Sequence, residues 1–257
     1  MEFIGIIPAR YASSRFPGKP LADIGGMTMI ERVYRQASKE LDNVYVATDD
    51  SRIFDTVTEF GGKAVMTSDT HRSGTDRCHE AYCNIGSHAD VVINIQGDEP
   101  FIDPSQIAEV KRCFDREDTD IATLVRPFDK ALGFDALFDN TKPKVVIDNS
   151  DNAIYFSRAI IPYVRNYPWN EWLDRQTFYM HVGMYAYRAD ILAKITALPQ
   201  SSLELAESLE QLRWLQNGYK IRVGYTDTPT IGIDTPADLE RAIKMISNDT
   251  PKAAHDA

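Results

Sequence analysis

The chain has 257 residues, 43% of them hydrophobic, which is enough for one globular domain with a full core or a domain with a subdomain. Its formal net charge of −10 argues against nonspecific binding to nucleic acid. No apolar run approaches the length of a membrane span, and residues 1–8 lack the basic region of a signal peptide. Three cysteines without a C-x-x-C motif, Cys78, Cys83 and Cys113, favour a reduced, cytosolic compartment.

A short apolar run, Phe3 to Ile7, predicts a buried parallel strand at the start of the chain. We expect Pro8 to end this strand, because proline cannot donate a hydrogen bond to a central ladder. The segment that follows, residues 9–20, is predicted to be a loop rather than a helix. Within it Pro17–Gly18 indicates a turn, and Gly18 would let the backbone approach a ligand closely.

This loop carries three cations and no acid, in a chain that is acidic overall. Arg10, Arg15 and Lys19 therefore indicate a seat for a small anion, although three cations in a loop are also compatible with a solvated surface. The loop is not a Walker A motif, because Gly18–Lys19 is followed by Pro20 instead of the Ser or Thr that reaches magnesium. The Rossmann pattern G-x-G-x-x-G does not occur here either.

Strands and helices alternate along the first half of the chain. The predicted helices are Met29–Leu41, one capped by residues 49–51 and stopped by Gly61–Gly62, one beginning near Cys78 after the polar loop His71–Arg77, and one beginning at Pro104. The further predicted strands are Val44–Thr48, Lys63–Thr67, Val91–Ile95 and Ile121–Val125. This alternation predicts a mainly parallel sheet with right-handed crossovers.

Polar residues follow three of these strands at the point where each ends. They are residues 10–19, Asp49–Asp50 and Gln96–Asp98. Ligands of parallel sheets bind beyond the carboxyl ends of the strands. We therefore expect the three polar sets to gather at one edge of the sheet.

After Phe128 the pattern changes. Lys144–Ile147 and Ala153–Phe156 are predicted to form antiparallel strands, residues 166–176 to be irregular, and Tyr179–Tyr187 to form a strand. We interpret residues 128–190 as a subdomain, within a single domain spanning 1–247, that closes over the sheet edge and carries a dimer contact. Residues 248–257 are expected to be a frayed tail.

The spacing of leucines predicts a helix over Leu203–Asn217. Its expected buried stripe is Leu205, Leu209, Leu212 and Leu215. Glu210 and Gln211 lie off this stripe and are expected outside the core. A strand over Lys220–Tyr225 and a last helix after Gly232–Pro236 complete the predicted elements.

Two isolated carboxylates stand out as metal ligands. Asp98 follows a buried strand and a glycine, and Asp234 precedes Thr235–Pro236 at the start of a helix. Brought together they would suit Mg²⁺, which takes one or two carboxylates plus substrate phosphates. Asp234 is equally compatible with a helix N-cap, and Asp98 with a turn. Ser, His and Asp residues lack a nucleophile-elbow context such as G-x-S-x-G.

Seven motifs follow one another between residue 3 and about residue 245. They are IPARYASSRFPGKP at 7–20, HRSGTD at 71–76, NIQGDEP at 94–100, YFSR at 155–158, HVGMYAY at 181–187, LEQLR at 209–213 and IDTP at 233–236. Through them the chain resembles the 3-deoxy-manno-octulosonate cytidylyltransferase (CMP-Kdo synthetase) family. Each motif is weak alone, but seven in this order are very specific. The resemblance implies a sugar nucleotidyltransferase fold: a Rossmann-like, mainly parallel sheet flanked by helices, with a smaller insertion for sugar binding and dimerisation.

The resemblance also implies an activity. CMP would pass from CTP to the anomeric hydroxyl of 3-deoxy-D-manno-octulosonate (Kdo), giving CMP-Kdo and pyrophosphate for lipopolysaccharide biosynthesis. It implies Mg²⁺ as the cofactor, a cytoplasmic homodimer, and no nucleic-acid or membrane partner. Two alternatives are a cytidylyltransferase for the 8-amino analogue of Kdo or another acidic sugar, and a nucleotide-binding regulator that has lost turnover.

On the family pattern the site residues fall into three groups. The catalytic group is Lys19, Arg10, Asp98 and Asp234, the two aspartates being the metal ligands. The nucleotide group is Pro8, Ala9, Arg10, Arg15, Lys19, Arg72, Ser73 and Gln96. The sugar group is Arg158, His181, Tyr185, Glu210 and Gln211, with Arg158 paired to the Kdo carboxylate. From the residues alone, His181 and Tyr185 are also compatible with structural roles and Arg158 with a surface ion pair.

Overall fold

The computed structural model describes residues 1–12 and 16–249. Arg15 and residues 250–257 of the expected tail lie outside the described residues, while residues 248–249 belong to the last helix. The chain forms two compact units that interleave along the sequence. The first unit contains residues 1–4, 88–94 and 103–229, and the second contains residues 5–87, 95–102 and the chain from 230 onward. The expected subdomain, 128–190, lies inside the first unit.

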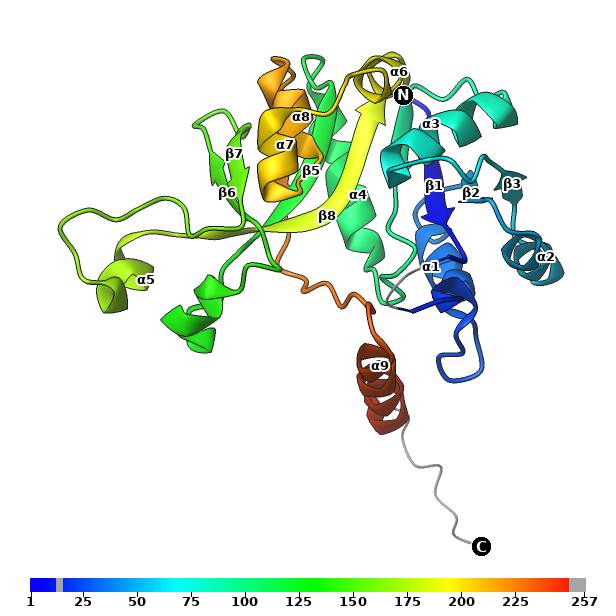
Figure 1. Cartoon of the computed structure of the whole chain (residues 1–257), viewed down its shortest axis with the longest axis horizontal. Helices are drawn as coiled ribbons and strands as arrows, with labels where there is room; N and C mark the ends of the chain where they lie inside the picture. The colour runs from blue at the N-terminus through cyan, green and yellow to red at the C-terminus, as the bar shows by residue number, and fades with distance from the viewer. Residues whose placement is uncertain (13–15, 250–257) are drawn as a thin grey trace, which may run out of the picture. The chain divides into compact units, whose positions relative to one another are not determined.

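The second unit is built on three parallel strands in the order β3-β2-β1 (Figure 1). Its strands are β1 (Phe3–Ala9), β2 (Val44–Thr48) and β3 (Ala64–Met66). Its helices are α1 (Met29–Ala37), α2 (Ser51–Glu59), α3 (Gly74–Ile85) and α9 (Pro236–Asp249), with the 3₁₀ turn Lys19–Leu21. Residues far apart in sequence meet in one of its cores, where Ile24 and Met29 pack with Ile233 and Ala242.

The prediction that Pro8 ends the first strand is wrong, because β1 continues to Ala9. The backbone oxygen of Ile6 accepts a hydrogen bond from the N–H of Ile95 at 2.9 Å, so the backbone polar groups of Ile6 face away from β2. Alternate residues of a strand face the same side, and the nitrogen of Pro8 therefore also faces away from β2. On that side residues 95–97 have left the ladder. The missing N–H consequently leaves no acceptor unpaired in the β1–β2 ladder.

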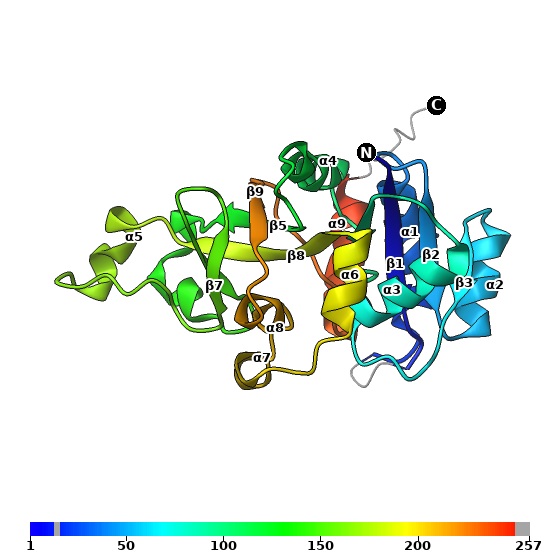
Figure 2. The same ribbon diagram turned by 90° about the horizontal axis from the view of Figure 1, so that it is seen from above.

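The first unit contains a mixed set of strands in the order β4-β8-β5-β9. Figure 2 labels four of this unit's strands, β5, β7, β8 and β9. Its strands are β4 (Val91–Asn94), β5 (Ile121–Pro127), β6 (Lys144–Ile147), β7 (Ala153–Ser157), β8 (Tyr179–Arg188) and β9 (Ile221–Tyr225). Its helices are α4 (Pro104–Arg112), α5 (Trp172–Arg175), α6 (Ala189–Thr196), α7 (Ser202–Glu207) and α8 (Gln211–Gln216). Short 3₁₀ turns cover Cys113–Asp115, Lys130–Leu132, Phe134–Phe138 and Trp169–Glu171.

The long strand β8 gives this unit its mixed character. It runs antiparallel to both β4 and β5, while β5 and β9 are parallel. The predicted antiparallel hairpin of β6 and β7 is confirmed, and β6 also pairs antiparallel with β8. The predicted α/β class, with helices around an open sheet, is therefore confirmed. The strand that follows the hairpin, β8, lies within the sheet between β4 and β5.

Two helix boundaries differ from the sequence prediction for local reasons. The helix expected near Cys78 begins at Gly74, because the side chain of Ser73 accepts a hydrogen bond from the backbone of Asp76 at 3.1 Å and caps it. The helix expected over Met29–Leu41 ends at Ala37. The predicted cap at Asp50 is confirmed, since its side chain accepts a hydrogen bond from the backbone of Arg52.

The single helix predicted over Leu203–Asn217 is wrong, because Ser208 adopts a left-handed conformation with φ of 51° and separates α7 from α8. The break interrupts the helical period, so the stripe is not continuous. Leu209 is 7% exposed, whereas Leu205 is 62% exposed. Gln211, expected outside the core, is 4% exposed.

We predict that Leu209→Ala lowers the free energy of unfolding by about 2–5 kcal/mol, because it empties a buried site. Leu205→Ala is the matched control and should change it by less than about 0.5 kcal/mol. Urea unfolding followed by circular dichroism measures both values. Equal losses from the two variants would contradict the broken helix.

Candidate active site

The ammonium group of Lys19 joins two carboxylates that are distant in the sequence. Its Nζ lies 2.8 Å from Oδ2 of Asp98 and 3.2 Å from Oδ1 of Asp234. The Lys19 side chain is 14% exposed, so this contact is partly shielded from water. The structure thus brings together three of the four residues of the predicted catalytic group, and the fourth, Arg10, lines the same pocket.

Backbone contacts hold these side chains in position. Gly18 has a φ of 73° and its N–H donates to the carbonyl of Tyr11 at 2.9 Å, which closes the basic loop just before Lys19. The backbone N–H of Ile233 donates to the carbonyl of Asp98 at 2.9 Å. This bond ties the Asp98 turn to the segment that carries Asp234.

The structure decides the alternative role of Asp234. Thr235 caps α9: its Oγ1 accepts from the backbone of Asp238 at 3.3 Å, and the Asp238 carboxylate accepts from the backbone of Thr235 at 2.8 Å. The N-cap interpretation of Asp234 is therefore wrong, and its carboxylate points instead to Lys19. Asp98 does lie in a turn, and it contacts Lys19 as well.

Two adjoining pockets in the second unit share one wall. Pro8, Ala9, Arg10 and Gln96 line both of them. The first pocket, of about 200 Å³, adds Lys19, Pro20, Gly97, Asp98 and Asp234. The second, of about 190 Å³, adds His71, Arg72, Ser73, Gly74 and Arg77. All the described residues of the predicted nucleotide group therefore line this pair of pockets.

Gly97 is needed where the wall is narrowest. A Cβ at this position would lie 2.9 Å from the backbone oxygen of Pro8, which cannot move aside as a flexible side chain would. The absence of a side chain lets the 96–98 turn lie against the end of β1. This close approach brings Gln96 and Asp98 beside Pro8 and Ala9.

Arg77 is a pocket residue that the sequence did not single out. It is buried, and it donates to Oγ1 of Thr67 at 2.6 Å and to Oδ2 of Asp49 at 3.0 Å. Asp49 therefore fixes the arginine, although the sequence predicted this acid at the ligand edge. A helical period extended back to Gly74 would place Arg77 on the same face as the buried Ala81.

The electrostatics of the first pocket suit a divalent cation held together with a phosphate. The carboxylates of Asp98 and Asp234 converge on the ammonium group of Lys19. Two carboxylates are the protein ligands that Mg²⁺ takes when substrate oxygens complete its coordination shell. Over residues 1–12 and 16–249 there is no cluster of three His, Cys, Asp or Glu side chains arranged for a metal ion. Burial, with the charge of Asp98, raises the pKa of the neighbouring Glu99 to about 7.

The five residues predicted to bind the sugar all lie in the first unit. Nε2 of His181 lies 2.9 Å from Oγ1 of Thr123, which is also 2.8 Å from the carbonyl oxygen of Met184. Burial lowers the pKa of His181 to about 4, so the imidazole is neutral at pH 7. Its ring packs against Tyr185, with 5.2 Å between the centroids.

Four buried polar atoms in the described chain have no hydrogen-bond partner, and one of them belongs to Tyr185. They are Oη of Tyr185, Nε2 of Gln211, Oδ1 of Asn94 and Nε1 of Trp214. Asn94 is opposite Tyr185 in the β4–β8 ladder, and the rings of Tyr185 and Trp214 are 5.1 Å apart. Unpaired buried groups are costly, so these atoms are available to hydrogen-bond a ligand or an ordered water. The sequence missed Asn94 and Trp214, since burial without a partner leaves no mark on it.

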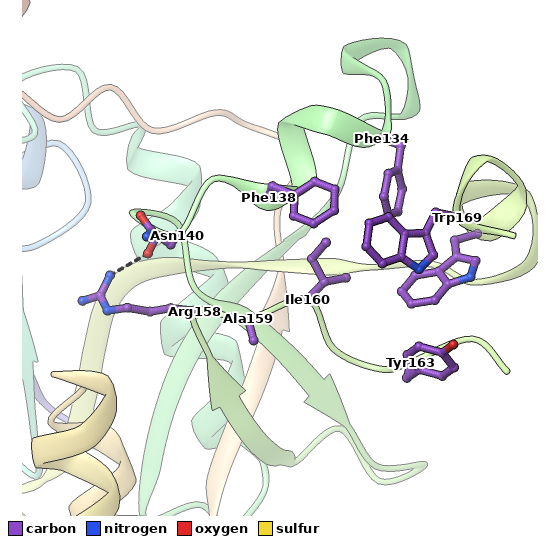
Figure 3. A pocket seen from close by; sticks show the side chains of 9 residues that line it. Phe134, Phe138, Asn140, Arg158, Ala159, Ile160, Tyr163 and Trp169 are labelled. Atoms are coloured by element: carbon purple, nitrogen blue, oxygen red, sulfur yellow. Dashed lines mark hydrogen bonds between the residues drawn. The ribbon is translucent and has the colours of Figure 1, made fainter.

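Arg158 lies at the end of an aromatic pocket of about 430 Å³ in the same unit (Figure 3). Its guanidinium group donates to three backbone carbonyl oxygens, those of Asn140, Glu207 and Ser208. The surface ion pair considered from the sequence is not formed among the described residues. Glu210 is half-buried and lies 3.7 Å from Arg213.

No helix in the described part of the chain is long and apolar enough to cross a membrane. The three cysteines form no disulfide.

Comparison with known proteins gives a consistent family. Residues 4–221 match the profile of the family described as Cytidylyltransferase. The 3-deoxy-manno-octulosonate cytidylyltransferase of Parabacteroides distasonis is 62% identical, over 96% of this chain and 99% of that protein. The protein of the same name from Bacteroides thetaiotaomicron is 61% identical, over 96% and 99%.

A solved structure leads to the same family. The structure of CMP:2-keto-3-deoxy-manno-octonic acid synthetase in complex with CTP matches with a TM-score of 0.87 and 41% identity, over 96% of this chain and 99% of that one. This chain therefore belongs to the 3-deoxy-manno-octulosonate cytidylyltransferase family of nucleotidyltransferases.

Proposed function

We propose that this chain transfers CMP from CTP to the anomeric hydroxyl of Kdo, releasing pyrophosphate and supplying CMP-Kdo for lipopolysaccharide biosynthesis. The observation that carries the proposal is the contact of Lys19 with Asp98 and Asp234 beside the paired pockets. In a chain of this family, the ammonium group of Lys19 would bind the triphosphate and the two carboxylates would bind a metal ion.

The nucleotide would occupy the paired pockets of the second unit. Arg10 and Lys19, together with Arg15 from outside the described residues, would hold the phosphates. Arg72, Ser73 and Gln96, with the backbone of Pro8 and Ala9, would surround the nucleoside. The support is that all the described members of this set line one or both of these adjoining pockets.

Asp98 and Asp234 would hold Mg²⁺, and a second Mg²⁺ would be carried on the triphosphate. The metal supplies neutralisation of the charge that develops on the leaving pyrophosphate. Lys19 now bonds to both carboxylates. In the loaded enzyme it would bond to phosphate oxygens and steady the same charge.

The sugar would contact the residues of the first unit. Arg158 keeps N–H groups beyond its three backbone bonds and would pair with the Kdo carboxylate. His181, Tyr185, Glu210 and Gln211 would bond the sugar hydroxyls. The neutral His181 and the unpaired atoms of Tyr185 and Gln211 support this assignment, because each can satisfy a hydroxyl group without adding charge.

The reaction itself needs the two substrates to be held in line. The anomeric hydroxyl oxygen of Kdo would attack the α-phosphorus and release its proton to solvent. The bond from the α-phosphorus to the oxygen bridging to the β-phosphorus would break, and pyrophosphate would leave with that oxygen. Positioning and charge stabilisation supply most of the catalysis in such transfers. We further propose a cytoplasmic homodimer, as the motif resemblance implies, without nucleic-acid partners, which the acidic composition supports.

A pyrophosphate-release assay with a panel of nucleotides and acidic sugars tests the activity. With Mg²⁺, we predict that kcat/KM for CTP exceeds that for UTP by a factor on the order of 10⁴. Cytosine carries an amino donor where uracil has an acceptor, and backbone oxygens near Pro8 and Ala9 would leave uracil unpaired. Equal use of CTP and UTP would refute the cytidylyl assignment. A preference for sialic acid or 8-amino-Kdo would change the assigned sugar substrate. No turnover with any sugar would favour a nucleotide-binding regulator.

The metal role is tested by two neighbouring substitutions. Asp234→Asn should require a several-fold higher Mg²⁺ concentration for half-maximal activity, because an amide brings no charge to a hard cation. Thr235→Ala is the matched control: it should lower the free energy of unfolding by about 1 kcal/mol through loss of the cap. Activity against Mg²⁺ concentration and urea unfolding are the measurements. An Asp234→Asn variant with unchanged Mg²⁺ dependence would exclude this ligand.

A further inference from the structure

Lys144 is a buried lysine without an acidic partner. It is the first residue of β6 and is 0% exposed. Its ammonium group donates to the backbone oxygen of Asp139 at 2.7 Å and to that of Arg158 at 3.3 Å. Among the described residues no carboxylate lies within ion-pair distance of it. Lysines are almost never fully buried unless they are paired, so this charge needs an explanation.

Arg158 is the neighbouring cation, and its surroundings are also backbone oxygens. Nε donates to Glu207 O at 2.7 Å, one Nη to Asn140 O at 2.9 Å and the other to Ser208 O at 3.2 Å. Figure 3 shows the Asn140 bond and the guanidinium group at the end of the pocket away from the aromatic side chains. Lys144 holds the carbonyl of Arg158 itself and of Asp139, the residue before Asn140. The lysine therefore fixes both the backbone of Arg158 and the segment that orients its side chain.

The nearby acids are engaged elsewhere. The carboxylate of Asp139 accepts from Thr141 and lies 3.5 Å from Lys142. The carboxylate of Glu207 accepts from Oγ of Ser157 at 2.6 Å and from the backbone of Arg158 at 2.9 Å. Burial lowers the pKa of Lys144, Asp139 opposes this, and the positive charges of Lys142 and Arg158 lower it further. Two cations thus lie together with no carboxylate bonded to either cationic group.

We propose that Lys144 is a positioning residue for the carboxylate of the acidic sugar: it fixes Arg158 through backbone bonds and adds a second positive charge to the site. The inference rests on the proposed function, since it assigns the anion to the sugar substrate. Lys144 is buried and does not touch the substrate. An anion bound to Arg158 would supply the negative charge that this pair of cations lacks.

A structural tie is the competing explanation, because the same bonds also link β6 to the 139–140 segment. Lys144→Met separates the two, since it keeps length and burial while removing the charge. Lys144→Gln keeps an N–H donor and also removes the charge, and it serves if the methionine variant does not fold. Lys142→Met is the matched control, because it removes an exposed lysine that contacts the same Asp139.

The test compares Kdo with its uncharged carboxamide. For each variant of the full chain, KM for Kdo and for CTP is measured by pyrophosphate release. Binding of Kdo and of the carboxamide is measured by calorimetry with a non-hydrolysable CTP analogue. Lys144→Met and Lys144→Gln should raise KM for Kdo about tenfold with KM for CTP within about twofold. The preference for carboxylate over carboxamide should fall by the same factor, and Lys142→Met should change neither quantity.

Other outcomes overturn the inference in recognisable ways. A lower Tm with an unchanged carboxylate preference would make Lys144 a structural tie only. Equal rises in both KM values would also contradict the proposal. If the wild-type chain binds Kdo but does not turn it over, the proposed function fails, while a reduced carboxylate preference in the variants would still support the role of Lys144. If the wild-type chain does not distinguish Kdo from its carboxamide, the inference about Lys144 fails.

Discussion

The candidate active site depends on one ammonium group shared between two carboxylates. Lys19, Asp98 and Asp234 come from three separate segments of the chain, and each segment is fixed by backbone: the Gly18 turn, the close approach of Gly97 to Pro8, and the bond from Ile233 to Asp98. Partly exposed ion pairs contribute little net stability, about 0–1 kcal/mol each. Such a weak contribution to stability does not explain three segments built to meet, so the arrangement is better explained by the ligand charges it can hold.

The two units use different chemistry for different parts of the proposed substrates. The second unit offers charge and backbone at the paired pockets, which suits phosphates and a metal ion. The first unit offers a neutral histidine and unpaired polar atoms, one of them on Tyr185, which suit hydroxyl groups. It also offers two cations, Arg158 and Lys144, that have no carboxylate of the described residues bonded to their cationic groups, which suits one carboxylate. A sugar that is both polyhydroxylated and acidic matches this combination.

Much of the fold follows from local sequence signals. Val44–Thr48 and the start of α4 at Pro104 agree with the sequence prediction, because apolar runs and caps act locally. The prediction failed where a distant partner or a single residue's conformation decides. Ser208 breaks the leucine stripe, and the Pro8 nitrogen faces residues 95–97, which follow the end of β4. The order of the motifs identified the nucleotide residues that line the two adjoining pockets. It could not show that Thr235 caps α9, that Lys144 is buried without an acidic partner, or that Oδ1 of Asn94 is buried without a hydrogen bond.

In the proposed function, the ammonium group of Lys19 occupies the place beside Asp98 and Asp234 that a metal ion takes when the nucleotide binds. The most direct measurement is a crystal structure with a non-hydrolysable CTP analogue and Mn²⁺, in which anomalous scattering locates the metal. The account predicts a metal ion bonded to both Asp98 and Asp234, with Nζ of Lys19 within hydrogen-bond distance of phosphate oxygens. A metal bound elsewhere, with Lys19 still bonded to the two carboxylates, would contradict it.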